Sequence, residues 1–322
     1  ELTHRALAGL LLLAACAHER EVLPAADRPY WESSRKAVKR SPAAVPKSAP
    51  VTPAPPQGPV PKEAALLARM SLEEKVGQVM MVGFSGLTVD EPVVELVKGR
   101  QVGGVCLFKR NIDTAEQVAQ LNDDLRALLP TVPPFIAADQ EGGNVVRLSD
   151  RNVVLPGNMV LGATRDAQLA YEAGRAQGDD LRRLGFNMNL APVLDVNSNP
   201  RNPVIGIRAF SDDIALVSEL GVQFVRGQQA ARVVTVAKHF PGHGAVEADS
   251  HKGLPVVTAP EAVLRGQLRP FVAAMRAGLD GMMTAHIATP TLSNGDSTPA
   301  TLSHHVLGDV LRGRGVAPQQ RQ

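Results

Sequence analysis

Residues 233–244, VVTVAKHFPGHG, join a short apolar run to a dense group of polar side chains. The apolar part has the length and composition of a strand that is buried on both faces of a parallel sheet. Lys238 and His239 come directly after the run, so we expect them on a long, glycine-bearing loop at the end of that strand. The segment therefore predicts a parallel α/β sheet with functional groups at its carboxyl edge.

The same pattern recurs along the chain. Five further apolar runs are expected to be strands, at residues 79–84, 104–108, 135–138, 186–194 and 281–285. Two stretches between them carry apolar residues at helical spacing: Val118, Leu121, Leu125 and Leu128 in one, and Leu264, Leu268, Phe271 and Met275 in the other. Ser71 and Glu74 have the spacing of a capping box, which predicts that a helix begins there.

Alternating strands and helices fit either an open doubly wound sheet or a (β/α)8 barrel. Asp139, Asp195, His239 and His286 each follow a different predicted strand, as barrel loops require. No glycine-rich phosphate-binding turn follows the first strand, as an open nucleotide-binding sheet would show. We therefore predict an α/β fold of the TIM barrel type, with about six β/α units in this chain.

Composition excludes several classes of protein. The 322 residues are 44% apolar, which is typical of a globular chain, and two cysteines exclude a disulfide framework and a four-cysteine zinc site. Residues 17–62 hold eight Lys or Arg and four Asp or Glu. Since the whole chain has a net charge of +2, residues 63–322 have a net charge of about −2. Nucleic acid is therefore not expected as the main partner.

The first 62 residues are expected to precede the globular domain of residues 63–322. Residues 1–16 contain an apolar run that is too short to span a bilayer and that ends in Leu13-Ala14-Ala15-Cys16, like a bacterial lipoprotein signal peptide. A lipid on Cys16 would then hold the protein on a membrane, at the periplasmic or cell-surface side. An ordinary secretory signal and a buried helix are the alternatives. Residues 17–62, rich in proline, alanine and basic residues, are predicted to be an extended linker, and a proline-rich peptide that binds a partner is the alternative.

The loop after the strand at 233–237 holds the candidates for proton transfer. Asp249 and His251 are two residues apart, close enough for the carboxylate to orient the imidazole as a general acid/base. A zinc site of His239, His243 and His251 competes with this interpretation, as does a Schiff-base enzyme that uses Lys238. The simplest alternative is that the histidines only satisfy buried carbonyl groups.

Four spaced motifs resemble glycoside hydrolase family 3, and more narrowly its β-N-acetylglucosaminidase branch. They are Asp139-Gln140-Glu141-Gly142-Gly143 with Arg147, Asn199 to Gly206 with Arg208, Lys238 to Gly244, and Asp249-Ser250-His251. The resemblance covers residues 66–314. It departs from the family at Asn144, where arginine is usual.

The resemblance implies a role for each matching residue. His251 would be the acid/base and Asp249 its orienting partner. The residues that bind the sugar would be Asp139, Arg147, Arg208, Lys238 and His239. For the two arginines, a structural ion pair with Asp139 or Asp195 is the alternative. Neither a cofactor nor a metal ion is expected.

A retaining glycosidase also needs a carboxylate nucleophile, which in this family follows the seventh strand. We find no matching segment up to Gln322, and neither Asp296 nor Asp309 lies at the end of a predicted strand. The nucleophile is therefore predicted to be absent from this chain, which as written is expected to have weak or no activity.

The resemblance implies hydrolysis of terminal non-reducing β-linked N-acetylglucosamine, from peptidoglycan fragments, with retention of configuration. Two alternatives stay open. One is a barrel that binds amino sugars or cell-wall fragments without cleaving them, and the other is a plain β-glucosidase.

Overall fold

The computed structural model describes residues 62–149, 154–248 and 253–313. Cys16, Asp249 and His251 lie outside these ranges. The chain divides into two units, one of residues 17–70 and one that contains Ser71 and the residues after it. In the first unit the structure describes helix α1 (Lys62–Arg69), which has no buried residue. Within the described ranges, no helix is long and apolar enough to cross a bilayer.

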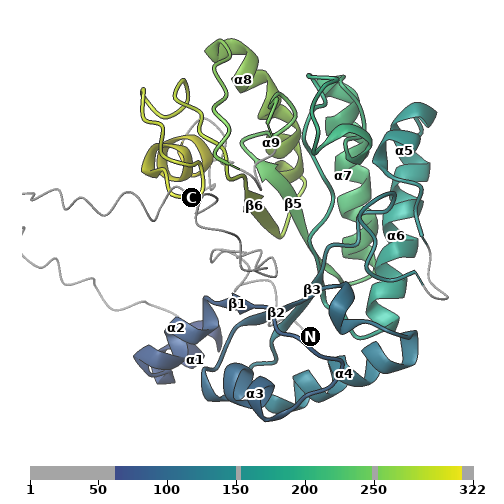
Figure 1. Ribbon diagram of the computed structural model, residues 1–322, viewed down its shortest axis with the longest axis vertical. Helices are drawn as coiled ribbons and strands as arrows, with labels where there is room; N and C mark the ends of the chain where they lie inside the picture. Colours follow the sequence, from purple (N-terminus) through teal and green to yellow (C-terminus); the bar gives the residue numbers. More distant parts are fainter. Residues whose placement is uncertain (1–61, 150–153, 249–252, 314–322) are drawn as a thin grey trace, which may run out of the picture. The chain divides into compact units, whose positions relative to one another are not determined.

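Six parallel strands in chain order form the sheet of the second unit (Figure 1). They are β1 (Met81–Val82), β2 (Gly104–Leu107), β3 (Phe135–Ala138), β4 (Met188–Asn189), β5 (Val234–Phe240) and β6 (Gly281–Thr284). Every strand pairs with the next strand along the chain. This order has no reversal, so the prediction of a barrel rather than a doubly wound sheet is confirmed, and the described strands form a curled half-barrel.

One helix of this unit precedes β1 and the others follow the strands, on the convex side of the sheet (Figure 1). They are α2 (Leu72–Gln78), α3 (Glu91–Val94), α4 (Ala115–Leu128), α5 (Asn158–Thr164), α6 (Ala167–Arg183), α7 (Ile214–Ala230), α8 (Glu261–Gln267) and α9 (Arg269–Arg276). Short turns of other helix types are η3 (Glu95–Gly99), η4 (Lys109–Asn111), η5 (Gly206–Arg208) and η6 (His305–Leu311).

The local signals in the sequence account for several of these boundaries. At the start of α2, the Ser71 hydroxyl accepts from the Glu74 amide and the Glu74 carboxylate accepts from the Ser71 amide, so the predicted capping box is confirmed. The apolar stripe predicted at Leu264, Leu268, Phe271 and Met275 is divided between two helices instead of lying on one. Pro270 stands in the first turn of α9, where its missing N–H and fixed φ favour a new helix start.

Alternation along the strands separates two apolar layers. On β2, Val105 and Leu107 pack with the outer helices, whereas Cys106 faces the other way and packs with Ala137 of β3 and Val236 of β5 inside the half-barrel. This is the period of two that a strand imposes on its side chains. A residue that continues the inner series past the end of a strand therefore points into the mouth of the barrel.

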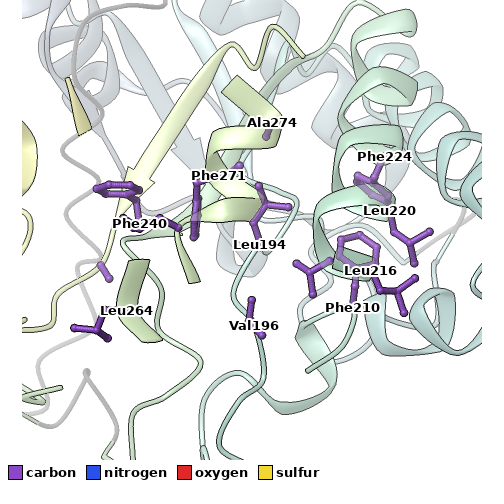
Figure 2. Close-up of a cluster of buried hydrophobic side chains, with 14 of the residues drawn as sticks. Leu194, Val196, Phe210, Leu216, Leu220, Phe224, Phe240, Leu264, Phe271 and Ala274 are labelled. Carbon is purple, nitrogen blue, oxygen red and sulfur yellow. The ribbon is translucent and has the colours of Figure 1, made fainter. Parts of the chain in front are cut away.

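The largest core cluster lies between the later strands and the helices α6, α7 and α9. Figure 2 shows its aromatic residues: Phe240 and Phe271 meet edge to face with ring centroids 5.6 Å apart, and Phe210 and Phe224 do so at 6.2 Å. All four side chains are at most 1% exposed. This packing fixes β5 against α9 and thereby fixes the strand that carries Lys238.

Strand β5 differs from the prediction, which ended it at residue 237. Lys238 and His239 lie within the strand rather than on the loop after it. The pairing with β6 shifts between Lys238 and Phe240, as in a β-bulge. Because of this extra residue Phe240 joins the outer core, while Lys238 continues the inner series of Val236.

Candidate active site

Asp139 is the first residue after β3 and continues the inner series of Ala137. Its side chain is 14% exposed, and its Oδ1 lies 2.7 Å from Nζ of Lys238 on β5. The two strands are separated by β4, so the sheet itself brings this pair together at the mouth. The predicted placement of both residues at the carboxyl edge is therefore confirmed.

Lys238 has two carboxylate partners. In addition to Asp139, Oε1 of Glu141 lies 2.6 Å from Nζ, and the lysine side chain is only 2% exposed. Burial lowers the pKa of Lys238, but the charges of Asp139 and Glu141 outweigh that effect and raise it above its ordinary value. A Schiff-base enzyme needs an uncharged amine, so this environment argues against that role for Lys238.

Arg208 lies in the turn η5 and makes a two-pronged ion pair with Glu141. Its Nε and Nη2 each donate to one carboxylate oxygen at 2.8 Å, and Nη1 donates to the carbonyl of Val204 at 3.1 Å. The predicted alternative to sugar binding was an ion pair of this arginine with Asp139 or Asp195, but the turn directs the guanidinium to Glu141 instead. Burial raises the pKa of Glu141, yet Lys238 and Arg208 together lower it to about 2.

Arg147 approaches the same cluster from the loop after β3. Its Nη2 is 3.5 Å from Oδ2 of Asp139. The buried amide of Gln140 holds the backbone of this loop, because Oε1 accepts from the amides of Arg147 and Leu148, and Nε2 donates to the Leu148 carbonyl. The guanidinium is thus held beside Asp139, one of the two ion-pair partners that were predicted as the alternative to a role in sugar binding.

His239 forms a second polar group with the fully buried Asp195, which follows β4. Its Nδ1 is 2.7 Å from Oδ2 of Asp195, whose Oδ1 also accepts from the His243 amide at 2.6 Å. Burial lowers the pKa of His239 below its ordinary value, although Asp195 opposes this. The neutral ring then donates from Nδ1 to the carboxylate, which leaves Nε2 as an acceptor.

The stem of the following loop is tied to the loop after β4. Asn202 donates to the His243 carbonyl at 2.8 Å and accepts from the amides of Val204 and Ile205. Asn199 donates from its amide to the Gly244 carbonyl at 3.3 Å. Both asparagines belong to the motif from Asn199 to Gly206, which was singled out in the sequence only because it resembles the family motif.

The described residues bring five of the predicted site residues to one end of the sheet: Asp139, Arg147, Arg208, Lys238 and His239. The predicted pair Asp249 and His251 lies outside the described residues.

For the proposed zinc ligands His239 and His243, the rings stand 5.9 Å apart edge to face. Within the described ranges, no three or more His, Cys, Asp or Glu side chains are grouped to hold a metal ion. His286 follows β6 and its Nδ1 is 3.3 Å from the Thr301 hydroxyl.

Comparison with known proteins agrees with this arrangement. Residues 71–315 match the glycosyl hydrolase family 3 N terminal domain. A beta-hexosaminidase A of Pseudoalteromonas piscicida is 39% identical over 244 residues, which cover 70% of this chain and 41% of the relative. A beta-hexosaminidase of Xylella fastidiosa is 37% identical over 243 residues, which cover 73% of this chain and 71% of the relative.

Two solved structures are similar as well. A family 3 beta-N-acetylglucosaminidase from Paenibacillus has a TM-score of 0.74 and 46% identity over 76% of this chain and 47% of that protein. NagZ from Neisseria gonorrhoeae, solved with N-trifluoroacetyl-D-glucosamine, has a TM-score of 0.68 and 32% identity over 72% of this chain and 70% of NagZ. The chain thus spans less than half the length of two of these four proteins. Since the family match covers most of the sequence and the Xylella relative is matched over more than two thirds of its length, the chain belongs to glycosyl hydrolase family 3.

Proposed function

We propose that the full-length protein hydrolyses terminal non-reducing β-linked N-acetylglucosamine with retention of configuration. The observation that carries the proposal is the pairing of Asp139 with Lys238 and Arg147 at the mouth of the half-barrel. Paired carboxylate, ammonium and guanidinium groups hold sugar hydroxyls by strong, directional hydrogen bonds, which can tighten in the transition state. The names of the relatives support an acetylated amino sugar as the substrate.

Each described group has a distinct part in binding. Asp139, which is partly exposed, accepts hydrogen bonds from hydroxyls of the terminal ring. Lys238 uses two of its three ammonium protons for Asp139 and Glu141, so the third is left for a hydroxyl. His239 offers Nε2 as an acceptor, because Asp195 holds its other nitrogen.

Proton transfer is assigned in this proposal to His251, with Asp249 as its orienting partner. An imidazole with a pKa near 6.5 can protonate the leaving oxygen and later deprotonate water, as a retaining double displacement requires. The second requirement is a carboxylate nucleophile, and none of the described residues is assigned to that role. The loop stem held by Asn202 leads into the segment that carries both predicted residues.

The test compares two aryl glycosides on the full-length gene product. We expect turnover of the aryl β-N-acetylglucosaminide with the β-anomer as first product by NMR, and at least tenfold lower kcat/KM on the aryl β-glucoside. His251→Ala should lower kcat/KM by about 100-fold or more. Preference for the glucoside would favour a β-glucosidase, and calorimetric binding of N-acetylglucosamine without turnover would favour a binding protein.

Peptidoglycan fragments as the natural substrate and a membrane anchor at Cys16 are further parts of this proposal. The signal-like residues 1–16 and the basic, proline-rich residues 17–62 support an exported protein on the periplasmic or cell-surface side. Residues 63–322 would then be the barrel domain. Labelling of growing cells with a fatty-acid probe should mark the protein, and Cys16→Ala should abolish the label. Unchanged label in that variant would refute the anchor.

A further inference from the structure

Glu141 and its partner Lys238 are both almost completely buried in the candidate site. Its carboxylate lies between Lys238 of β5 and Arg208 of η5, with three nitrogen to oxygen distances between 2.6 and 2.8 Å. The Glu141 side chain is 2% exposed, whereas those of Asp139, Arg208 and Arg147 are 14, 15 and 25% exposed. The Lys238 side chain is also 2% exposed, so Asp139, Arg208 and Arg147 are the more accessible groups of the cluster and Glu141 is enclosed among its partners.

The charge balance shows what the carboxylate does there. Lys238 and Arg208 are two cations that share Glu141, while Asp139 is divided between Lys238 and Arg147. Two cations this close repel each other, and the repulsion is strong where water is largely excluded. Without Glu141, a single carboxylate would face three cations, and the ammonium and guanidinium groups would separate.

We propose that Glu141 is a positioning residue, which sets the separation of Lys238 and Arg208 so that both can hold hydroxyls of one sugar ring. This inference rests on the proposed function, because it assigns Lys238 and Arg208 to substrate. No separate role was predicted for Glu141 from its sequence position or from the family resemblance. The residue acts through its two partners and does not touch the reacting atoms.

Glu141→Gln tests the inference, because it keeps the shape of the side chain and removes its charge. We expect kcat/KM on the aryl β-N-acetylglucosaminide to fall by about 100-fold, the usual effect of displacing a binding group by about 1 Å. The matched control is Glu247→Gln, which breaks an ion pair with Arg201 of similar length, 2.7 Å, whose side chains are 69 and 79% exposed. The control should retain kcat/KM within twofold.

A pH profile separates positioning from a purely structural role. The charged groups around Lys238 are Asp139, Glu141 and Arg208, and the titratable ring of His239 lies near it as well. Removing one of the two anions lowers the pKa of the ammonium. The affinity of the Glu141→Gln variant for N-acetylglucosamine, measured by calorimetry, should therefore fall at lower pH than that of the wild type. An affinity profile that stays in place, or a variant as active as the Glu247→Gln control, would overturn the inference.

Folding could fail in the neutral variant, so a second variant is needed. Glu141→Asp keeps the charge and shortens the side chain by one methylene, and we expect an intermediate loss of kcat/KM with most of the thermal stability retained. Full activity in Glu141→Asp would also refute the positioning role.

Calorimetry with N-acetylglucosamine on the same proteins distinguishes a failure of the proposed hydrolysis from a failure of the role proposed for Glu141. A wild type that binds the sugar but does not cleave the glycoside contradicts hydrolysis alone, and the variants' affinities then test Glu141.

Discussion

Gly244→Ala is the substitution for which the structure makes the sharpest prediction. A Cβ built on Gly244 lies 1.7 Å from the carbonyl oxygen of Val196 and 2.6 Å from its carbonyl carbon. Both contacts are with backbone, which cannot rotate away as a side chain can. One of the two segments must therefore move by about 1 Å or more, a displacement that typically costs about 100-fold in rate when it reaches a site.

The site lies directly beside this contact. Val196 follows Asp195, whose carboxylate accepts from the His243 amide at 2.6 Å. Any shift of Gly244 away from Val196 stretches that hydrogen bond and with it the support of His239. We expect kcat/KM on the aryl β-N-acetylglucosaminide to fall by about 100-fold, and the free energy of unfolding to fall by about 1–3 kcal/mol, as for an overpacked core.

Gly253→Ala is the matched control, because it makes the same change in the same connection between β5 and α8. A Cβ at Gly253 meets no heavy atom within 4 Å, so activity and stability should stay close to wild type. Initial rates and urea unfolding of both variants provide the comparison. If Gly244→Ala matched Gly253→Ala in both measurements, the close approach of the two loops would not matter and the reasoning would be refuted.

Three further predictions concern stability and use urea unfolding. The pKa of Glu141 is about 2, against an ordinary 4.5, so its contribution of about 3 kcal/mol to the free energy of unfolding is complete above pH 4.5 and is lost as the pH falls toward 2. Glu141→Gln should make the free energy of unfolding less dependent on pH in this range, and an unchanged dependence would contradict the assignment. Phe271→Ala should cost about 3–5 kcal/mol because the buried ring packs on Phe240, whereas Val263→Ala, 49% exposed, should cost under about 0.5; equal losses would count against it. Asn202→Ala leaves three backbone groups without their side-chain partner and should cost about 1–3 kcal/mol; a neutral result would mean that water replaces the amide.

The fold was predictable because its signals are local and periodic. Apolar runs of four to nine residues located all six strands, and the capping box at Ser71 located the start of α2. Asp139 and His239 could be assigned to the carboxyl edge from their position after such runs. The strand boundaries were less accurate, since apolar character persists beyond the residues that pair in β1 and β4.

The details of β5 were not predictable from pattern alone. Its polar residues resembled the start of a loop, but Lys238 and His239 pair into the sheet through a bulge. A buried lysine in a strand contradicts simple hydropathy, and it is stable here only because two carboxylates from the end of β3 neutralise it. The information that makes the strand possible therefore lies about a hundred residues earlier in the chain.

Glu141 illustrates the same limit at the level of the site. The sequence placed it two residues after Asp139, and strand periodicity would direct both side chains to the same side. Only the three-dimensional structure shows that one carboxylate reaches the mouth while the other is enclosed by Lys238 and Arg208. A buried ion pair is weak support for stability, because desolvation offsets much of the attraction. Two cations converging on one inaccessible anion are better explained by the need to hold both cations at a fixed spacing, and a sugar ring with several hydroxyls is a ligand that makes use of that spacing.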